Sequence, residues 1–119
     1  MDAKVHTVET HPAETRVRLS CAGMVIADSS AAVRLEETGH NTVYYFPQSD
    51  VRMDLLTATD HATVCPFKGD ASYWTVNVNG SEIENAAWAY LDPIADAEGI
   101  RGHIAFYRGK LEADYEFPD

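Results

Sequence analysis

The sequence predicts an all-β protein, built as a compact antiparallel two-sheet sandwich or a small barrel-like sheet pair with one or two short helical turns. Three observations lead to this prediction. Short runs rich in β-branched and aromatic residues alternate between apolar and polar positions. Turn-forming residues separate these runs about every 8 to 12 residues, giving about seven to nine strands. No segment keeps a helical period beyond about two turns.

The chain of 119 residues suits one domain. Residues 1–15 are polar and carry no clear period, so we expect a tail or an added edge segment there. Residues 16–119 are expected to form a single β domain, because no linker, repeat or low-complexity segment interrupts them.

The first predicted hairpin spans residues 16–29. In "RVRLSC", Val17 and Leu19 lie on one face of a strand, and "MVIADS" is the returning strand. Between them, Ala22 and Gly23 predict the turn.

Two further strands are expected before the chain reaches its middle. In residues 32–37, "AVRLEE", Val33 and Leu35 alternate with charged neighbours. "GHNT" then breaks the pattern, and the β-branched and aromatic run "VYYFP" over residues 43–47 ends at a proline.

The segment of residues 48–56, "QSDVRMDLL", is the first place where a helix competes with a strand. Ser49 is a suitable cap, and Val51 and Leu55 are spaced to point inward, but the segment has room for only about two turns.

Two more hairpins are predicted in the C-terminal half. "SYWTVNV" and "SEIENAAWAYL" flank Asn79-Gly80, a dipeptide suited to a type I′ turn. A loop over residues 93–102, with a helical turn at "IADAEG", leads to "HIAFY". Arg108-Gly109 then predicts a last turn that pairs "HIAFY" with "KLEADYEF".

Charge excludes several classes of partner. Nineteen acidic residues face nine basic ones, the net charge is −10, and the basic residues do not cluster. Nucleic acids and anionic membrane surfaces are therefore not expected as partners, because both bind cationic patches. The chain shows no membrane-spanning apolar run and no signal-peptide pattern, so we expect a cytoplasmic protein with Cys21 and Cys65 reduced.

Residues 61–74, "HATVCPFKGDASYW", combine several reactive residue types near a tight connection. Lys68 beside Cys65 would favour a nucleophilic thiolate, and His103 could act as its base, so these three are the candidate catalytic residues. The alternative is a buried, inert Cys65 with Lys68 solvated beside Asp70.

Metal and cofactor motifs are scarce. His61, Cys65 and His103 form a weak metal hypothesis, because the chain lacks the paired C-x-x-C ligands typical of zinc sites. No phosphate loop, dinucleotide fingerprint or G-x-S-x-G motif occurs, so no cofactor is predicted.

The aromatic residues on the expected strands indicate a pocket. Alternation puts Tyr73 and Trp74 on opposite faces and Trp88 and Tyr90 on the same face. Eight large aromatic side chains are many for the core of so small a sheet pair, so we expect some of them to line a cavity with Lys68 and His103 as polar anchors.

An ordered set of motifs resembles a family of small bacterial and fungal proteins, domain-of-unknown-function family four hundred and twenty-seven. The motifs are "VRLEETGH", "VYYFPQSDVRMDLL", "CPFKGDASYW", "AAWAYLDP" and "GHIAFY", and the resemblance covers about residues 16–117. It implies an open, tent-like packing of two antiparallel sheets. The family sometimes carries a nucleotidyltransferase-like label, but this sequence lacks the Gly-Ser and paired-aspartate signature of such enzymes.

The resemblance attaches no catalytic role to any residue. Among the positions that match its motifs, the candidate ligand-binding residues are Arg34, Tyr45, Tyr73, Trp88 and Tyr90. The leading hypothesis is a protein that binds an unidentified small molecule near Cys65 and Lys68, or an undescribed enzyme. The alternatives are a non-catalytic homodimeric interaction module and, more weakly, a metal-binding protein.

Overall fold

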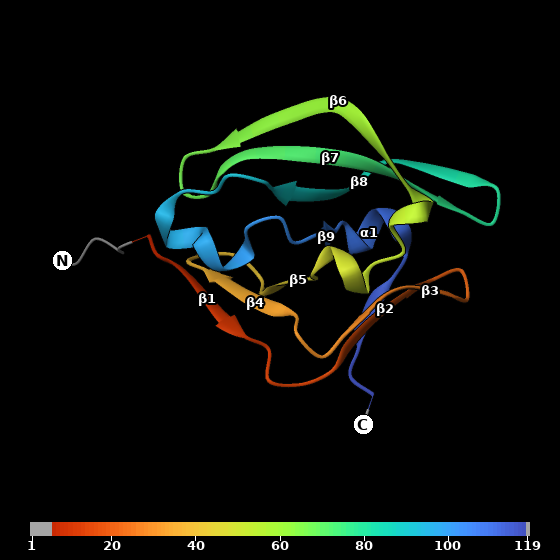
Figure 1. Cartoon of the computed structure of the whole chain (residues 1–119), viewed down its shortest axis with the longest axis horizontal. Helices are drawn as coiled ribbons and strands as arrows, with labels where there is room; N and C mark the ends of the chain where they lie inside the picture. The colour runs from red at the N-terminus through yellow and green to blue at the C-terminus, as the bar shows by residue number, and fades with distance from the viewer. Residues whose placement is uncertain (1–5, 119) are drawn as a thin grey trace.

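The computed structural model describes residues 6–118, which form ten strands in three antiparallel sheets (Figure 1). Residues 1–5, part of the segment interpreted as a tail or edge, lie outside the described residues. The strands are β1 (Val8–Pro12), β2 (Val17–Cys21), β3 (Met24–Ser29), β4 (Val33–Glu37), β5 (Val43–Tyr45), β6 (Leu56–Cys65), β7 (Gly69–Val78), β8 (Ser81–Tyr90), β9 (Ala105–Phe106) and β10 (Asp114–Glu116).

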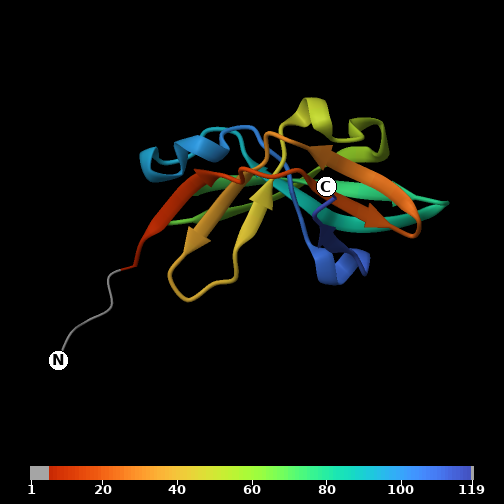
Figure 2. The ribbon, with the colours of Figure 1, turned by 90° about the horizontal axis from the view of Figure 1, so that it is seen from below.

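The sheets are arranged as a sandwich with one divided layer. The four-stranded sheet β6-β7-β8-β9 lies on one side of the molecule (Figure 1). On the other side, the sheets β1-β4-β5 and β10-β2-β3 lie next to each other (Figure 2). An isolated bridge between Phe46 and Ile104 joins the two layers where β5 ends and β9 begins. The predicted all-β class is confirmed, and the described strands do not close into a barrel.

Two predicted hairpins are confirmed in their turns as well as their strands. β2 pairs with β3 through Ala22 and Gly23, which both have positive φ angles of 52° and 80°. β7 pairs with β8 through Asn79 and Gly80, with φ angles of 51° and 83°. Positive φ at both central positions is the geometry of a type I′ turn, which matches the right-handed twist of the paired strands.

The helical segments are all short. They are the 3₁₀ turns η1 (Gln48–Asp50), η2 (Met53–Leu55) and η3 (Ala95–Ile100) and the single α-helical turn α1 (Arg108–Leu111). The predicted helical turns at residues 48–56 and 94–99 are confirmed, but Ser49 lies inside η1 and the cap position is Pro47. No helix in the described part of the chain has the length and apolar character required to cross a membrane.

The predicted last hairpin is wrong. Arg108-Gly109 begins α1 instead of a tight turn, and the Leu111 N–H donates to the Tyr107 carbonyl. The chain then crosses to the other layer, where β10 pairs with β2 and not with β9. There the Tyr115 hydroxyl accepts a hydrogen bond from the Tyr44 N–H at 3.0 Å. The long-range pairing of β10 with β2 therefore prevails over the local preference of Arg108-Gly109 for a hairpin turn.

Strand β6 has no counterpart among the predicted strands. It is the outer strand of its sheet and most of its residues are exposed, so it lacks the apolar alternation that marks a half-buried strand. Its pairing with β7 is interrupted between Ala58 and Ala62, which pair with Trp74 and Ser72. Two more residues lie on β6 than on β7 across this gap, so β6 bulges and bends there.

The buried side chains form two clusters. The first, here called the aliphatic core, contains mainly Val17, Leu19, Ile26, Ala27, Phe46, Val76, Ile104 and Phe106. The second, here called the tyrosine core, contains Leu35, Tyr45, Ala71, Tyr73, Tyr90, Ala97, Ile100 and Ala105. Trp88 packs against the tyrosine core and Trp74 against the aliphatic core.

Candidate functional site

A cavity of about 350 Å³ borders the tyrosine core. Its walls come from both layers: from β4, β5 and the loop between them, and from β7, β8, β9 and the β6–β7 turn. The residues that line it are Leu35, Glu37, His40, Asn41, Thr42, Val43, Tyr45, Lys68, Tyr73, Trp88, Tyr90, Phe106, Tyr107, Arg108 and Tyr115.

The aromatic wall follows from strand alternation. Tyr73 of β7 is directly opposite Trp88 of β8, and Tyr90 lies two residues further along β8. Side chains two apart on a strand project from the same face, as the sequence predicted for Trp88 and Tyr90. All three line the cavity, whereas Trp74 packs against the aliphatic core.

Tyr45 holds Trp88 in place from the opposite layer. The Trp88 Nε1–H donates to the Tyr45 hydroxyl at 3.3 Å, and the two rings meet edge-to-face with centroids 6.1 Å apart. Tyr45 is only 1% exposed, and this burial raises the pKa of its hydroxyl far above the ordinary value. The phenol therefore stays protonated and the indole orientation is fixed.

A second pair of phenols, Tyr73 and Tyr107, lies near Trp88. The Tyr73 hydroxyl is 2.8 Å from Thr63 Oγ1 on β6, and the Tyr107 ring lies 4.4 Å from that of Trp88. Burial, followed by a hydrogen bond with Tyr73, raises the pKa of Tyr107 to about 12. The Tyr107 hydroxyl is therefore protonated at neutral pH.

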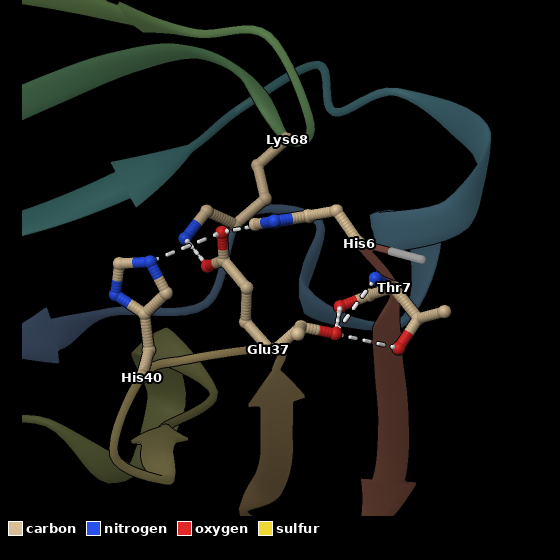
Figure 3. A network of polar contacts seen from close by, with 6 residues as sticks. His6, Thr7, Glu37, His40 and Lys68 are labelled. Atoms are coloured by element: carbon tan, nitrogen blue, oxygen red, sulfur yellow. Dashed lines mark hydrogen bonds and ion pairs between the residues drawn. The ribbon is translucent and has the colours of Figure 1, made fainter. Parts of the chain in front are cut away.

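A buried carboxylate, Glu37, lines the cavity, and Figure 3 shows its polar partners. Glu37 is the last residue of β4, and its side chain is 5% exposed. Lys68 Nζ donates to Glu37 Oε1 at 2.6 Å, and the His6 Nε2 atom lies 2.8 Å from Glu37 Oε2. The His40 Nε2 atom lies 3.7 Å from the same oxygen. These partners come from the β6–β7 turn, the residues before β1 and the β4–β5 loop.

These partners lower the pKa of Glu37 by more than its burial raises it. Burial alone would raise the pKa of its carboxyl group, because an ion is less well solvated inside the protein. The hydrogen bonds from Lys68 and His6 and the nearby positive charge act in the opposite direction and are stronger together, so the pKa is lowered. Glu37 is therefore a carboxylate at neutral pH.

Strand alternation in the sequence indicates that the Glu37 side chain points inward, although a charged residue is not expected at such a position. Val33 and Leu35 alternate toward the interior, and Glu37 is the next position in the same phase. A carboxylate at an inward position requires a buried cation. Lys68 supplies that cation from 31 positions away, and its side chain is only 14% exposed.

The residues before β1 contribute to this junction. The His6 ring stacks on the Phe67 ring with centroids 3.7 Å apart and 19° between the planes. Thr7 is tied to Thr38 through a hydrogen bond from its N–H to Thr38 Oγ1 at 2.9 Å. One short segment thus joins the end of β4 to the β6–β7 turn.

Tyr90 differs from the other phenols of the cavity. Its side chain is 6% exposed and lines the cavity, yet none of the described residues forms a hydrogen bond with its hydroxyl. The Lys68 Nζ atom lies 5.7 Å from the centre of its ring. Burial, followed by nearby groups that include Cys65 and Tyr73, raises the pKa of this hydroxyl well above the ordinary value.

The sequence-derived candidates divide into two groups. Lys68 and the four aromatic candidates line the cavity together, whereas Arg34, Cys65 and His103 do not. The Arg34 Nε atom lies 2.8 Å from Glu36 Oε2, and the His103 Nδ1 atom lies 2.9 Å from the Arg101 carbonyl. Cys65 is half-buried at the end of β6.

The stretch from Cys65 to Gly69 is a well-formed turn as well as part of the site. The Lys68 N–H donates to the Cys65 carbonyl at 3.2 Å, and the Ile94 N–H donates to the Lys68 carbonyl at 2.9 Å. Gly69 has a φ angle of 115°, and a Cβ there would approach the Asp92 carbonyl to 3.3 Å. The turn requires glycine and directs Lys68 toward the cavity.

The metal hypothesis receives no geometric support. Within residues 6–118, no group of three or more His, Cys, Asp or Glu side chains is arranged to hold a metal ion. His61 instead packs edge-to-face on Tyr73, with centroids 4.5 Å apart. His61, Cys65 and His103 therefore do not form a ligand set.

These features define a small β-sandwich protein with an aromatic cavity between its layers. The family model described as domain of unknown function DUF427, labelled NTP_transf_9, matches residues 9–116. The chain belongs to this family, as the motifs indicated. A search of curated proteins found no match.

Proposed function

We propose that the protein binds a small molecule in the cavity between its layers. One observation carries this proposal: aromatic side chains from both layers converge on a cavity of about 350 Å³, together with a few charged and hydroxyl groups. Ligand pockets are typically concave, lined by aromatic and apolar side chains with a few polar groups, and measure roughly 300–1,000 Å³.

The cavity also favours binding over the alternative of a flat interaction surface. Tyr73 and Tyr90 are only 7% and 6% exposed, and both line the concave site with Trp88. A surface used to pair with another chain would expose such rings. Nucleophilic catalysis by Cys65 with His103 is not part of the proposal, because neither residue lines the cavity.

The two tryptophans supply a test with an internal control. Trp88 lines the cavity and Trp74 packs against the other core, so their indole N–H signals report on separate regions in an NMR spectrum. We expect at least one of three single-ring probes, benzoate, benzamide or benzylammonium, to shift the Trp88 signal saturably and leave Trp74 unchanged. No response at Trp88, or equal linear shifts of both signals, would contradict the proposal.

A pair of variants separates cavity binding from surface binding. Val43→Phe places a larger side chain in the cavity wall, and Val64→Phe makes the same change on β6, where Val64 is 75% exposed. We expect Val43→Phe to abolish the Trp88 response and Val64→Phe to keep it. Equal responses from the two variants would locate the binding elsewhere.

A further inference from the structure

We propose that the ligand is a small ring-bearing oxyanion, an aromatic or heteroaromatic carboxylate, bound between Lys68 and Tyr90 with its ring against Trp88. This inference rests on the proposed function and specifies its ligand class. It follows from the charge of the lining, from the two donors that face the cavity and from the shape of the aromatic wall.

Basic residues outnumber acidic residues in the cavity lining, whereas acidic residues predominate in the whole chain. The whole protein has 19 acidic and 9 basic residues, so acids predominate about twofold. Among the lining residues, Lys68 and Arg108 are basic and Glu37 is the single acid. Arg108 is held away from the Lys68 end, because it stacks 4.4 Å above Tyr115 and pairs with Asp114. Lys68 is therefore the cation that a ligand meets beside Tyr90.

Glu37 is poorly placed to recognise a cationic ligand. One of its oxygens accepts from Lys68, and the other faces both His6 and His40. The charge of the carboxylate is already compensated, and its oxygens are occupied. Lys68 differs, because an ammonium group has three donors and Glu37 uses one of them. The remaining donors suit an acceptor on the ligand.

Tyr90 adds a second donor beside Lys68. Its side chain is 6% exposed, and its hydroxyl is protonated at neutral pH and has no hydrogen-bond partner among residues 6–118. Because Tyr90 lines the cavity, its hydroxyl is available to donate a hydrogen bond to water or to a ligand there. Lys68 Nζ lies 5.7 Å from the centre of the Tyr90 ring, and we infer that the two oxygens of one carboxylate accept from both groups.

The aromatic wall accounts for the ring. Trp88 contacts Tyr45, whose hydroxyl fixes the indole, and also Tyr107, whose ring tilts 38° against it at 4.4 Å between centroids. Planar molecules bind such surfaces by stacking or edge contacts. A volume of about 350 Å³ accommodates one or two fused rings with a carboxylate.

Three probes of similar ring size and different charge test this ligand class. Benzoate, benzamide and benzylammonium are titrated while the Trp88 indole N–H signal is followed by NMR. Hydrogen bonds to a charged group are worth about 1.5–3 kcal/mol, so benzoate should bind roughly 10-fold or more tightly than benzamide. Benzylammonium should bind most weakly, because it meets the Lys68 charge.

The outcomes separate this inference from the proposal on which it rests. If benzamide or benzylammonium binds as tightly as benzoate, the ligand class is wrong and small-molecule binding stands. If none of the three probes shifts Trp88, both the proposed function and this inference fail.

Variants of Lys68 and Tyr90 test whether these two donors cause the preference for benzoate over benzamide. Tyr90→Phe removes only the unpartnered hydroxyl and should weaken benzoate about tenfold with little change for benzamide. The double variant Lys68→Met, Glu37→Gln removes the ion pair without changing the net charge, and should eliminate the preference for benzoate. Arg52→Met, which removes a cation paired with Asp54 away from the cavity, is the control and should retain the preference. An equal loss in the control would overturn the assignment.

Discussion

The two cores of the molecule are built for different purposes. The aliphatic core consists mainly of Val, Leu, Ile, Ala and Phe side chains, and most of its buried members come from β2, β3, β7 and β8. The tyrosine core contains three phenols and borders the cavity. The comparison teaches that one half of the sandwich is built almost entirely from apolar side chains, while the other half retains phenol hydroxyls and charged groups beside the aromatic cavity. Each prediction below tests this division.

The largest effect is expected in the aliphatic core. Phe46 is fully buried and meets Phe106 edge-to-face with centroids 6.1 Å apart. Phe46→Ala should lower the free energy of unfolding by about 3–5 kcal/mol, because it removes apolar contacts and leaves a cavity. Urea denaturation followed by circular dichroism measures the loss. A change below about 1 kcal/mol would show that this core is not tightly packed.

The next largest effect is expected at the ion pair. Lys68→Met leaves the Glu37 carboxylate buried without its cation, which should cost about 3 kcal/mol at neutral pH. The double variant Lys68→Met, Glu37→Gln should recover most of this loss, because no buried charge remains. Urea unfolding of the single and double variants measures both effects. Equal stability of the two variants would mean that Glu37 does not depend on Lys68.

Acid should reveal the contribution of Glu37. Its folded pKa is lowered, so its stabilising effect is complete above the ordinary glutamate value of about 4.3 and is lost as the pH falls through the lower folded value. At neutral pH, Glu37→Gln should cost about 1–2 kcal/mol, and this difference from the wild type should shrink on acidification. Urea unfolding at a series of pH values tests this. A constant difference would contradict the ionised state of Glu37.

The smallest effect distinguishes two phenols of the same core. Tyr45→Phe removes the acceptor of the Trp88 N–H and should cost about 1 kcal/mol. Tyr90→Phe removes a hydroxyl without a partner among the described residues and should change stability by less than about 0.5 kcal/mol. Comparing the two variants by urea unfolding tests whether Tyr90 is retained for a ligand. A larger cost at Tyr90 would indicate a structural role.

Local patterns in the sequence predicted the elements whose signals are local. The β2–β3 and β7–β8 hairpins are specified by dipeptides that accept positive φ angles, and Trp88 and Tyr90 share a face because strands alternate. By contrast, β10 was misplaced because its partner β2 is far away in the sequence, and no local pattern encodes that pairing. Strand β6 was missed because an exposed outer strand has no apolar alternation.

The candidate site, like the fold, was predictable only where its residues follow from local sequence patterns. The aromatic residues and Lys68 could be nominated from strand periodicity and from the turn before β7, and they line one cavity. Which charge Lys68 would meet was not predictable, because Glu37 approaches it across the two layers from 31 positions away. Cys65 is a candidate because Lys68 follows it closely, and His103 because of its residue type, but neither feature indicates which side chains line the cavity.

The interruption in β6 bears on how the chain behaves at high concentration. β6 is a ten-residue outer strand with free backbone groups along one side, the kind of edge that can recruit a second chain. Regular pairing along β6 is limited to Leu56–Ala58 and Ala62–Cys65, with the bulge between them. A second copy would find no continuous register across this edge, and a bulge of this kind protects β proteins from sheet extension and fibre growth.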